Sequence, residues 1–267
     1  MIRKAAVAHQ FYPGEPATLH RMLKELIPDH PQPRKALALV MPHAGYVYSG
    51  RVAGETAARA DIPENVIILG PNHHGLGAPA ALMDQGSWEM PWGMVPVDEK
   101  LAAAVLVHCP DFSPDPSAHR QEHSLEVLVP FLHHRQAALR IVPICLARSD
   151  FAFCLRAGRG LAAAIRSHRQ PVLLAASSDM SHYESRASAS AKDRLAIDRV
   201  LALDPEGLYQ TVAAHQISMC GVIPTVITLI AARELGASRA ELVRYSDSGA
   251  VSGDLDQVVG YAGFIVS

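Results

Sequence analysis

Two adjacent histidines, His73 and His74, follow directly on an apolar run that ends at Gly70 and Pro71. In a parallel α/β sheet, ligands bind in the crevice beyond the carboxyl ends of the strands. Imidazoles at such a place can bind a divalent metal or transfer protons. Because neighbouring residues of an extended chain point to opposite sides, we expect at most one of the two histidines to face a site.

Three further predicted strands are followed by residues that can also bind a metal or transfer protons, namely histidines and aspartates. Taken singly, each of these residues is explained by a loop hydrogen bond or a turn. Taken together, strand ends so far apart in the chain can meet only at one edge of a sheet. There, two imidazoles and an anionic ligand would leave positions on a divalent metal open for a substrate. The three strands and the residues after them are Ala36–Met41 with His43, Pro171–Ser178 with Asp179 and His182, and Glu241–Ser246 with Asp247.

A second polar cluster opens the predicted helix Ser124–His134. Ser124 is a plausible N-cap, and Glu126 would then lie in the first turn, where a carboxylate compensates the helix dipole. His123 either reaches the site or supports it by holding Glu126 or a backbone carbonyl, and the pattern favours support. Cys220 precedes another predicted helix, as either a packed residue or an activated thiol.

The elements that must position these residues alternate between strand and helix. This alternation favours one α/β domain over residues 1–267, with a central mixed, mostly parallel sheet flanked by helices. The two closing strands could be antiparallel. The Gly- and Pro-rich segment Gly75–Pro96 is too irregular for an assignment and is expected to pass over the mouth of the sheet. The predicted helices are Glu15–Ile27, Val52–Ala60, Asp98–Val107, Ser124–His134, a helix ending at Ser167, Ala187–Leu203, Pro205–His215 and Val222–Leu235.

Composition excludes several classes of function. The 267 residues carry a formal net charge of −2 without blocks of like charge, which argues against nucleic acid or anionic lipid as a partner. No apolar stretch approaches the length of a membrane span. Four cysteines without a C-x-x-C motif indicate free thiols, so we expect a cytoplasmic protein. The chain has no G-x-G-x-x-G, P-loop or G-x-S-x-G motif, which argues against a nucleotide fold, a kinase and a serine hydrolase.

A series of short motifs, in order over nearly the whole chain, resembles the Memo-like family, whose prokaryotic members are often called AmmeMemoRadiSam system protein B. That name suggests a functional link to a radical-SAM protein. The motifs are Phe11-Tyr12-Pro13, Pro42-His43-Ala44-Gly45-Tyr46 with Tyr48-Ser49-Gly50, Leu69-Gly70-Pro71-Asn72-His73-His74, Glu122-His123-Ser124-Leu125-Glu126, Ser177-Ser178-Asp179-Met180-Ser181-His182-Tyr183, Cys220-Gly221, Tyr245-Ser246-Asp247-Ser248-Gly249 and Gly260-Tyr261-Ala262-Gly263.

The resemblance implies a fold like that of the class III extradiol ring-opening dioxygenases, in which two histidines and a glutamate hold non-haem Fe(II). Memo-like proteins are described with two histidines and a cysteine as ligands. The resemblance thus implies His43 and His73 as ligands and His182 as the pocket's additional histidine. An alignment on Tyr245 and Tyr261 without gaps puts Val251 at the cysteine position. The third ligand would then be Asp247, Asp254 or water.

Two functional hypotheses follow. The first is a site for Fe(II) or copper that carries out metal-assisted oxygen or redox chemistry on a small molecule, with His182, His123 and Asp179 as the catalytic groups. The second, motivated by Val251, is a non-catalytic protein that keeps the pocket to bind a peptide or small ligand. A metal-dependent hydrolase is a third alternative, because the same ligands could activate water.

Overall fold

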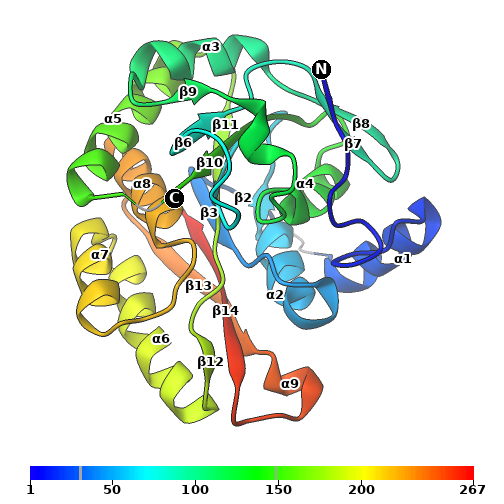
Figure 1. Ribbon diagram of the computed structural model, residues 1–267, viewed down its shortest axis with the longest axis vertical. Coiled ribbons are helices and arrows are strands. Elements are labelled where there is room, and N and C mark those ends of the chain that lie inside the picture. Colours follow the sequence, from blue (N-terminus) through cyan, green and yellow to red (C-terminus); the bar gives the residue numbers. More distant parts are fainter. Residues whose placement is uncertain (30–31, 148) are drawn as a thin grey trace.

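Four parallel strands form the centre of the sheet in the computed structural model, which describes residues 1–29, 32–147 and 149–267 (Figure 1). Nearly every residue of these strands is buried, as expected for continuous apolar runs that are covered on both faces. Their carboxyl ends lie at one edge of the sheet, the edge that the sequence analysis identified. In spatial order they are β3 (Ala38–Met41), β11 (Val172–Ser177), β5 (Asn65–Pro71) and β10 (Arg140–Leu146).

The two strands that adjoin the central four, β14 and β6, run antiparallel to them. On one side β14 pairs with β3 and with its own neighbours β12 and β13, and on the other side β6 pairs with β10. Nine strands of the described residues join this sheet, which confirms the mixed sheet and the antiparallel closing pair. The flanking strands are β6 (Ala80–Leu82), β9 (Ser113–Pro114), β12 (His182–Glu184), β13 (Ala240–Asp247) and β14 (Val258–Val266).

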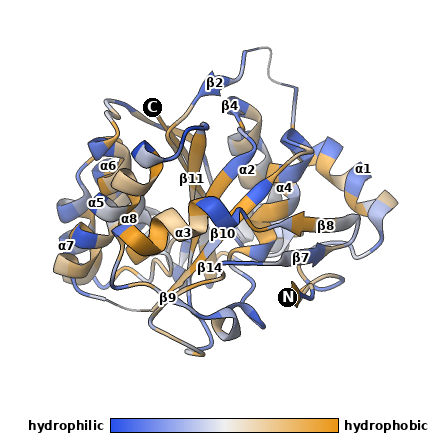
Figure 2. Ribbon diagram, turned by 90° about the horizontal axis from the view of Figure 1, so that it is seen from above, coloured by the Kyte–Doolittle hydropathy of each residue, from blue (hydrophilic) through white to orange (hydrophobic). Residues whose placement is uncertain are grey.

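Helices cover both faces of the sheet (Figure 2). One layer contains α3 (Glu99–His108), α5 (Phe151–Ser167), α6 (Arg186–Leu201), α7 (Pro205–Ala214) and α8 (Val222–Glu234). The other contains α1 (Pro16–Leu26), α2 (Tyr46–Arg59) and α4 (Val129–Arg135). The apolar strands lie between these layers, so the architecture is the single α/β domain with a helix-flanked mixed sheet that the sequence predicted. No helix in the described residues combines the length and apolar character that crossing a membrane requires.

The segment Gly75–Pro96 is more regular than the sequence predicted. It contributes β6 to the main sheet and then forms the hairpin of β7 (Ser87–Met90) and β8 (Gly93–Pro96). The amino-terminal strand β1 (Ile2–Arg3) pairs in parallel with β7. A small separate pair is formed by β2 (Arg34–Lys35) and β4 (Ala60–Asp61). The short strands were missed because Gly, Pro and polar residues interrupt their alternation.

Two predicted helix starts are displaced in the structure. The helix expected from Val52 begins at Tyr46, directly after the histidine loop. The helix expected from Ser124 is instead the 3-10 turn η2 (Glu126–Leu128) followed by α4, and another turn, η1 (Pro116–His119), precedes it. Ser124 does not cap this helix, because its hydroxyl donates to the carbonyl of Pro71. A loop residue thereby ties the second polar cluster to the end of β5.

Candidate metal centre

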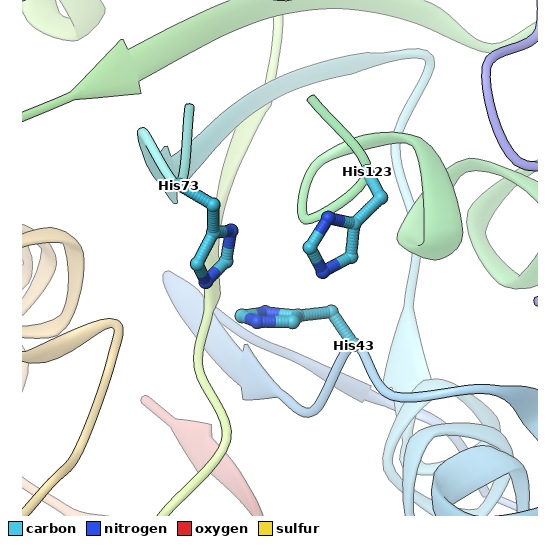
Figure 3. A group of neighbouring side chains, drawn as sticks. All are labelled: His43, His73 and His123. Atoms are coloured by element: carbon cyan, nitrogen blue, oxygen red, sulfur yellow. The ribbon is translucent and has the colours of Figure 1, made fainter. Parts of the chain in front are cut away.

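Three imidazoles converge beyond the carboxyl ends of the central strands (Figure 3). His43 lies two residues after β3, His73 two residues after β5, and His123 on the segment before η2. One nitrogen of each lies within 4.8 Å of the others, and these three residues can hold a metal ion. His43 is buried, whereas 31% of the His73 and 19% of the His123 side chain is exposed, so the group is open on one side.

A chain of two hydrogen bonds fixes the ring of His43. The Ser177 hydroxyl donates to the backbone carbonyl of Ser124 at 2.6 Å, and Nδ1 of His43 lies 2.7 Å from the same hydroxyl oxygen. Since the hydroxyl proton is already used, the oxygen accepts from Nδ1–H of His43. Nε2 therefore keeps its lone pair. Burial, together with the neighbouring His123 and His73, lowers the pKa of His43 well below its usual range, which keeps the ring neutral and able to bind a metal.

Glu122 fixes the ring of His73. Its carboxylate accepts from the backbone N–H of His73 at 2.6 Å and from the Nδ1 side of the ring at 2.8 Å. Although burial alone would raise it, these interactions with His73 and the bond from the Ser124 N–H hold the pKa of Glu122 well below its usual range. A carboxylate only accepts hydrogen bonds, so Nδ1 of His73 carries the proton and Nε2 is free. Glu122 was not among the site residues predicted from the sequence.

His123 completes the group as the third imidazole. Its ring stacks on that of His73, with ring centroids 4.6 Å apart and an interplanar angle of 20°, and Phe11 packs on it at 4.7 Å. Nδ1 of His123 lies 3.5 Å from Glu122, so one carboxylate lies against two of the three rings. Burial lowers the pKa of His123 to about 4. The sequence pattern favoured a supporting role for His123, whereas the geometry places it among the three candidate ligands.

A thiol also lies beside the histidines, and it comes from the segment before helix α8 and not from the end of a strand. Sγ of Cys220 lies 3.3 Å from Nε2 of His43, and it accepts from the backbone N–H of Asp179 at 3.3 Å. Gly221 permits this approach, because a Cβ there would meet the carbonyl oxygen of Ser177 at 2.2 Å. Burial and the nearby Asp179 raise the pKa of Cys220, so the metal-free thiol keeps its proton.

The alignment put Val251 at the cysteine position, whereas the thiol that lies next to His43 is that of Cys220. Val251 lies in the short helix α9 (Gly249–Ser252), with 57% of its surface exposed, and is outside the histidine group. Cys220 comes from the segment before α8, not from the loop between β13 and β14. Asp247 lies outside the group too: its carboxylate forms an ion pair with Arg186 at 2.6 Å and accepts from the N–H of Ala250.

Asp179 and His182 border the histidine group. The Asp179 carboxylate accepts from the backbone N–H of His43 at 2.8 Å and lies 4.0 Å from its Nε2. Burial raises the pKa of Asp179 to about 6, against the effect of these hydrogen bonds and of His182. His182 lies outside the group of three rings; its Nδ1 is 2.9 Å from the carbonyl of Ser218, which can only accept, so its Nε2 is free.

Glu126 serves the amino-terminal segment instead of a helix dipole. Its fully buried carboxylate forms an ion pair with Arg3 and accepts from the backbone N–H groups of Ala6 and Val7 and from the hydroxyl of Tyr12. These bonds fix the segment that carries Phe11 against His123. The role predicted for Glu126 was wrong, because the residue lies in a 3-10 turn and its partners are more than a hundred positions away.

The donor set is chemically suited to a first-row divalent metal. Imidazole nitrogens and a thiolate favour ions such as iron, copper and zinc over magnesium or calcium. Hydrogen bonds at Nδ1 hold the rings of His43 and His73 so that Nε2 of each is oriented as a donor. Metal sites commonly hold their histidine ligands in this way. Together with the fold, this defines an α/β protein with a histidine-lined, metal-capable site at the carboxyl edge of its sheet.

Comparison with known proteins names the family. The family model for Memo-like protein matches residues 3–265. A MEMO1 family protein of Methanopyrus kandleri is 41% identical over 279 residues, covering 99% of both chains. One of Aquifex aeolicus is 39% identical over 266 residues, covering 99% of this chain and 98% of the other. The chain therefore belongs to the Memo-like family, as its motifs predicted.

A solved structure shares the fold at low sequence identity. An uncharacterized protein of Escherichia coli K12 superimposes with a TM-score of 0.60 at 14% identity, covering 86% of this chain and all of the other. This likeness concerns the fold alone.

Proposed function

We propose that this protein binds Fe(II) or copper through His43, His73 and His123, with Cys220 as a further ligand, and carries out oxygen or redox chemistry on a small molecule. The observation that carries the proposal is the convergence of three histidine nitrogens within 4.8 Å. The thiol at 3.3 Å from His43 supports it. When bound, the metal would supply Lewis acidity and redox capacity at the open side of the site.

The groups beside the ligands suit proton transfer. His182 is held at Nδ1 by Ser218, so its Nε2 can take up a proton from a bound hydroxyl group. Asp179 holds the backbone of His43 and lies next to the thiol, where it can orient the ligands and balance the charge of an ion. We therefore assign the proton-moving role to His182 and a charge-balancing role to Asp179. Asp247 takes no part in this proposal, because Arg186 occupies its carboxylate.

The alternative of a non-catalytic binding protein had Val251 as its motive. Cys220 beside His43 offers a sulfur ligand from another segment, which favours the metal-binding proposal over this alternative. Peptide or ligand binding that a chelator does not affect, without any metal uptake, would favour this alternative.

The experiment is elemental analysis of untagged protein purified without oxygen, for the wild type and for His73→Ala. Near-stoichiometric iron or copper in the wild type, lost in the variant, is the expected result. His215→Ala is the matched control, because this exposed histidine follows α7 and lies outside the group. Fe(II)-dependent oxygen consumption by the wild type would then justify screening hydroxyl-bearing small molecules. Trace metal in all three proteins would contradict the proposal.

A further inference from the structure

The carboxylate of Glu122 is buried completely and takes part in several hydrogen bonds. Oε2 accepts from the backbone N–H of His73, and Oε1 lies 2.8 Å from Nδ1 of the same residue. Oε1 also accepts from the N–H of Ser124 at 2.9 Å and lies 3.5 Å from Nδ1 of His123. One carboxylate thus holds the loop after β5 and the loop before η2 in register.

In the described part of the chain, no Lys or Arg side chain forms an ion pair with the carboxylate of Glu122; the Arg3 guanidinium donates to the backbone carbonyl of Glu122 at 2.7 Å. Among the described residues, its side chain forms contacts of ion-pair distance only with the rings of His73 and His123. Four positions away, the equally buried Glu126 pairs with Arg3. A buried carboxylate without a cation is costly, so its retention calls for a positive charge elsewhere in the environment. A divalent ion at the Nε2 side of the two rings would be that charge.

We infer that Glu122 is the positioning residue of the metal centre: it fixes His73 as an Nε2 donor, steadies His123 and balances the charge of the ion from behind the rings. The inference rests on the proposed function and deepens it, because it assigns a role to a residue that does not touch the metal. A purely structural role would need only the two backbone N–H groups. The additional contacts with Nδ1 of both rings distinguish a positioning role of Glu122 from a purely structural one.

The first test uses metal-free protein, so it does not depend on metal binding. In 15N NMR of histidine-labelled protein, with the His73 signals assigned by their loss in His73→Ala, the ring should be the Nδ1–H tautomer. In Glu122→Gln a single acceptor oxygen replaces two, and the Nε2–H tautomer should become populated. Glu126→Gln removes an equally buried carboxylate that has no imidazole partner and should leave the His73 tautomer unchanged. An Nε2–H ring in the wild type would overturn the inference, and so would a ring that stays the Nδ1–H tautomer in Glu122→Gln.

The second test measures affinity for Co²⁺ by competition with a chelator. Glu122→Gln should bind roughly 10- to 100-fold more weakly than the wild type, the usual effect of removing an outer partner of a ligand. Glu122→Asp, which keeps the charge on a shorter side chain, should recover part of the loss, and Glu126→Gln should lose less. Equal affinities for Glu122→Gln and the wild type would contradict the inference.

If Glu122→Gln does not fold, the tautomer of His73 in the wild type is the measurement that decides. A wild type that takes up no ion, with the tautomer dependence intact, would contradict the proposed function and support the role of Glu122 toward His73. The two failures are therefore distinguishable.

Discussion

Sγ of Cys220 lies 3.3 Å from Nε2 of His43, although 177 positions separate the two residues in the chain. The contact depends on Gly221, whose missing side chain lets the segment before α8 approach the end of β11. Sulfur and imidazole at this distance can share one ion, and the Asp179 carboxylate, 4.0 Å from Nε2 of His43, lies beside both. Of the proposed ligands, the thiol is therefore the one most directly open to test.

Replacement of Cys220 by serine should weaken metal binding and remove its spectroscopic signature. With Co²⁺ as the probe, the wild type should show a sulfur-to-metal charge-transfer band that Cys220→Ser lacks, because a serine hydroxyl is a poor ligand for this ion. Cys154→Ser is the control, since Cys154 is buried in α5 away from the histidines. An unchanged band in Cys220→Ser would show that the sulfur does not bind.

Much of the fold could be predicted because its central strands are buried on both faces. Runs such as Asn65–Gly70 are continuous and apolar, and their boundaries agree with β5 to within one residue. The segment Gly75–Pro96 could not be assigned, because its short strands depend on partners far away, such as β10 and β1. Local pattern carries little information where pairing with distant strands decides the structure.

The site was predictable only where it coincides with strand ends. His43 and His73 were found because each follows a buried strand, a position where chemistry is common in α/β folds. Cys220 lies between two helices, so nothing local indicated that it meets His43. Glu122 adjoins His123 in the sequence, and its nearness to a histidine was the signal that could have found it. Its partner His73 comes from another loop, which only the tertiary structure reveals.

The buried pair of Arg3 and Glu126 should contribute strongly to stability. Arg3→Met removes the cation and leaves the buried Glu126 carboxylate without its ion-pair partner, which typically costs about 3–5 kcal/mol. Urea unfolding of both single variants, Arg3→Met and Glu126→Gln, and of the double variant gives the coupling energy. The exposed pair Arg194 and Asp198 is the control cycle, and its coupling should stay below about 1 kcal/mol. Coupling of similar size in both cycles would contradict this prediction.

Phe11 should matter for the metal site without binding the metal. Its ring packs on His123 at 4.7 Å, and an aromatic contact of this kind is worth about 0.5–1.5 kcal/mol. Phe11→Ala should therefore lower Co²⁺ affinity by roughly tenfold at most. Phe151→Ala removes a comparable contact with Tyr209 beyond the site and should leave the affinity unchanged. If both variants bind Co²⁺ like the wild type, His123 does not depend on the amino-terminal segment.

Acid should destabilise the protein through His119, a buried histidine beneath the amino-terminal strand. Burial, with the nearby Arg3, lowers the pKa of His119 to about 4, whereas an unfolded chain titrates near 6.5. The folded state therefore excludes a proton that the unfolded state accepts. Its contribution is complete above pH 6.5 and is lost as the pH falls from 6.5 to about 4, which amounts to about 2 kcal/mol by pH 5.

His119→Gln should remove this part of the pH dependence, because an amide does not titrate. The measurement is the free energy of unfolding in urea at pH 7 and pH 5. The decrease between the two values should be smaller in the variant than in the wild type by about 2 kcal/mol, whatever the absolute cost of the substitution. His108→Gln alters an exposed histidine at the end of α3 and should keep the wild-type decrease. An equal decrease in His119→Gln would mean that His119 is protonated in the folded protein, and that its burial beside Arg3 does not exclude the charge.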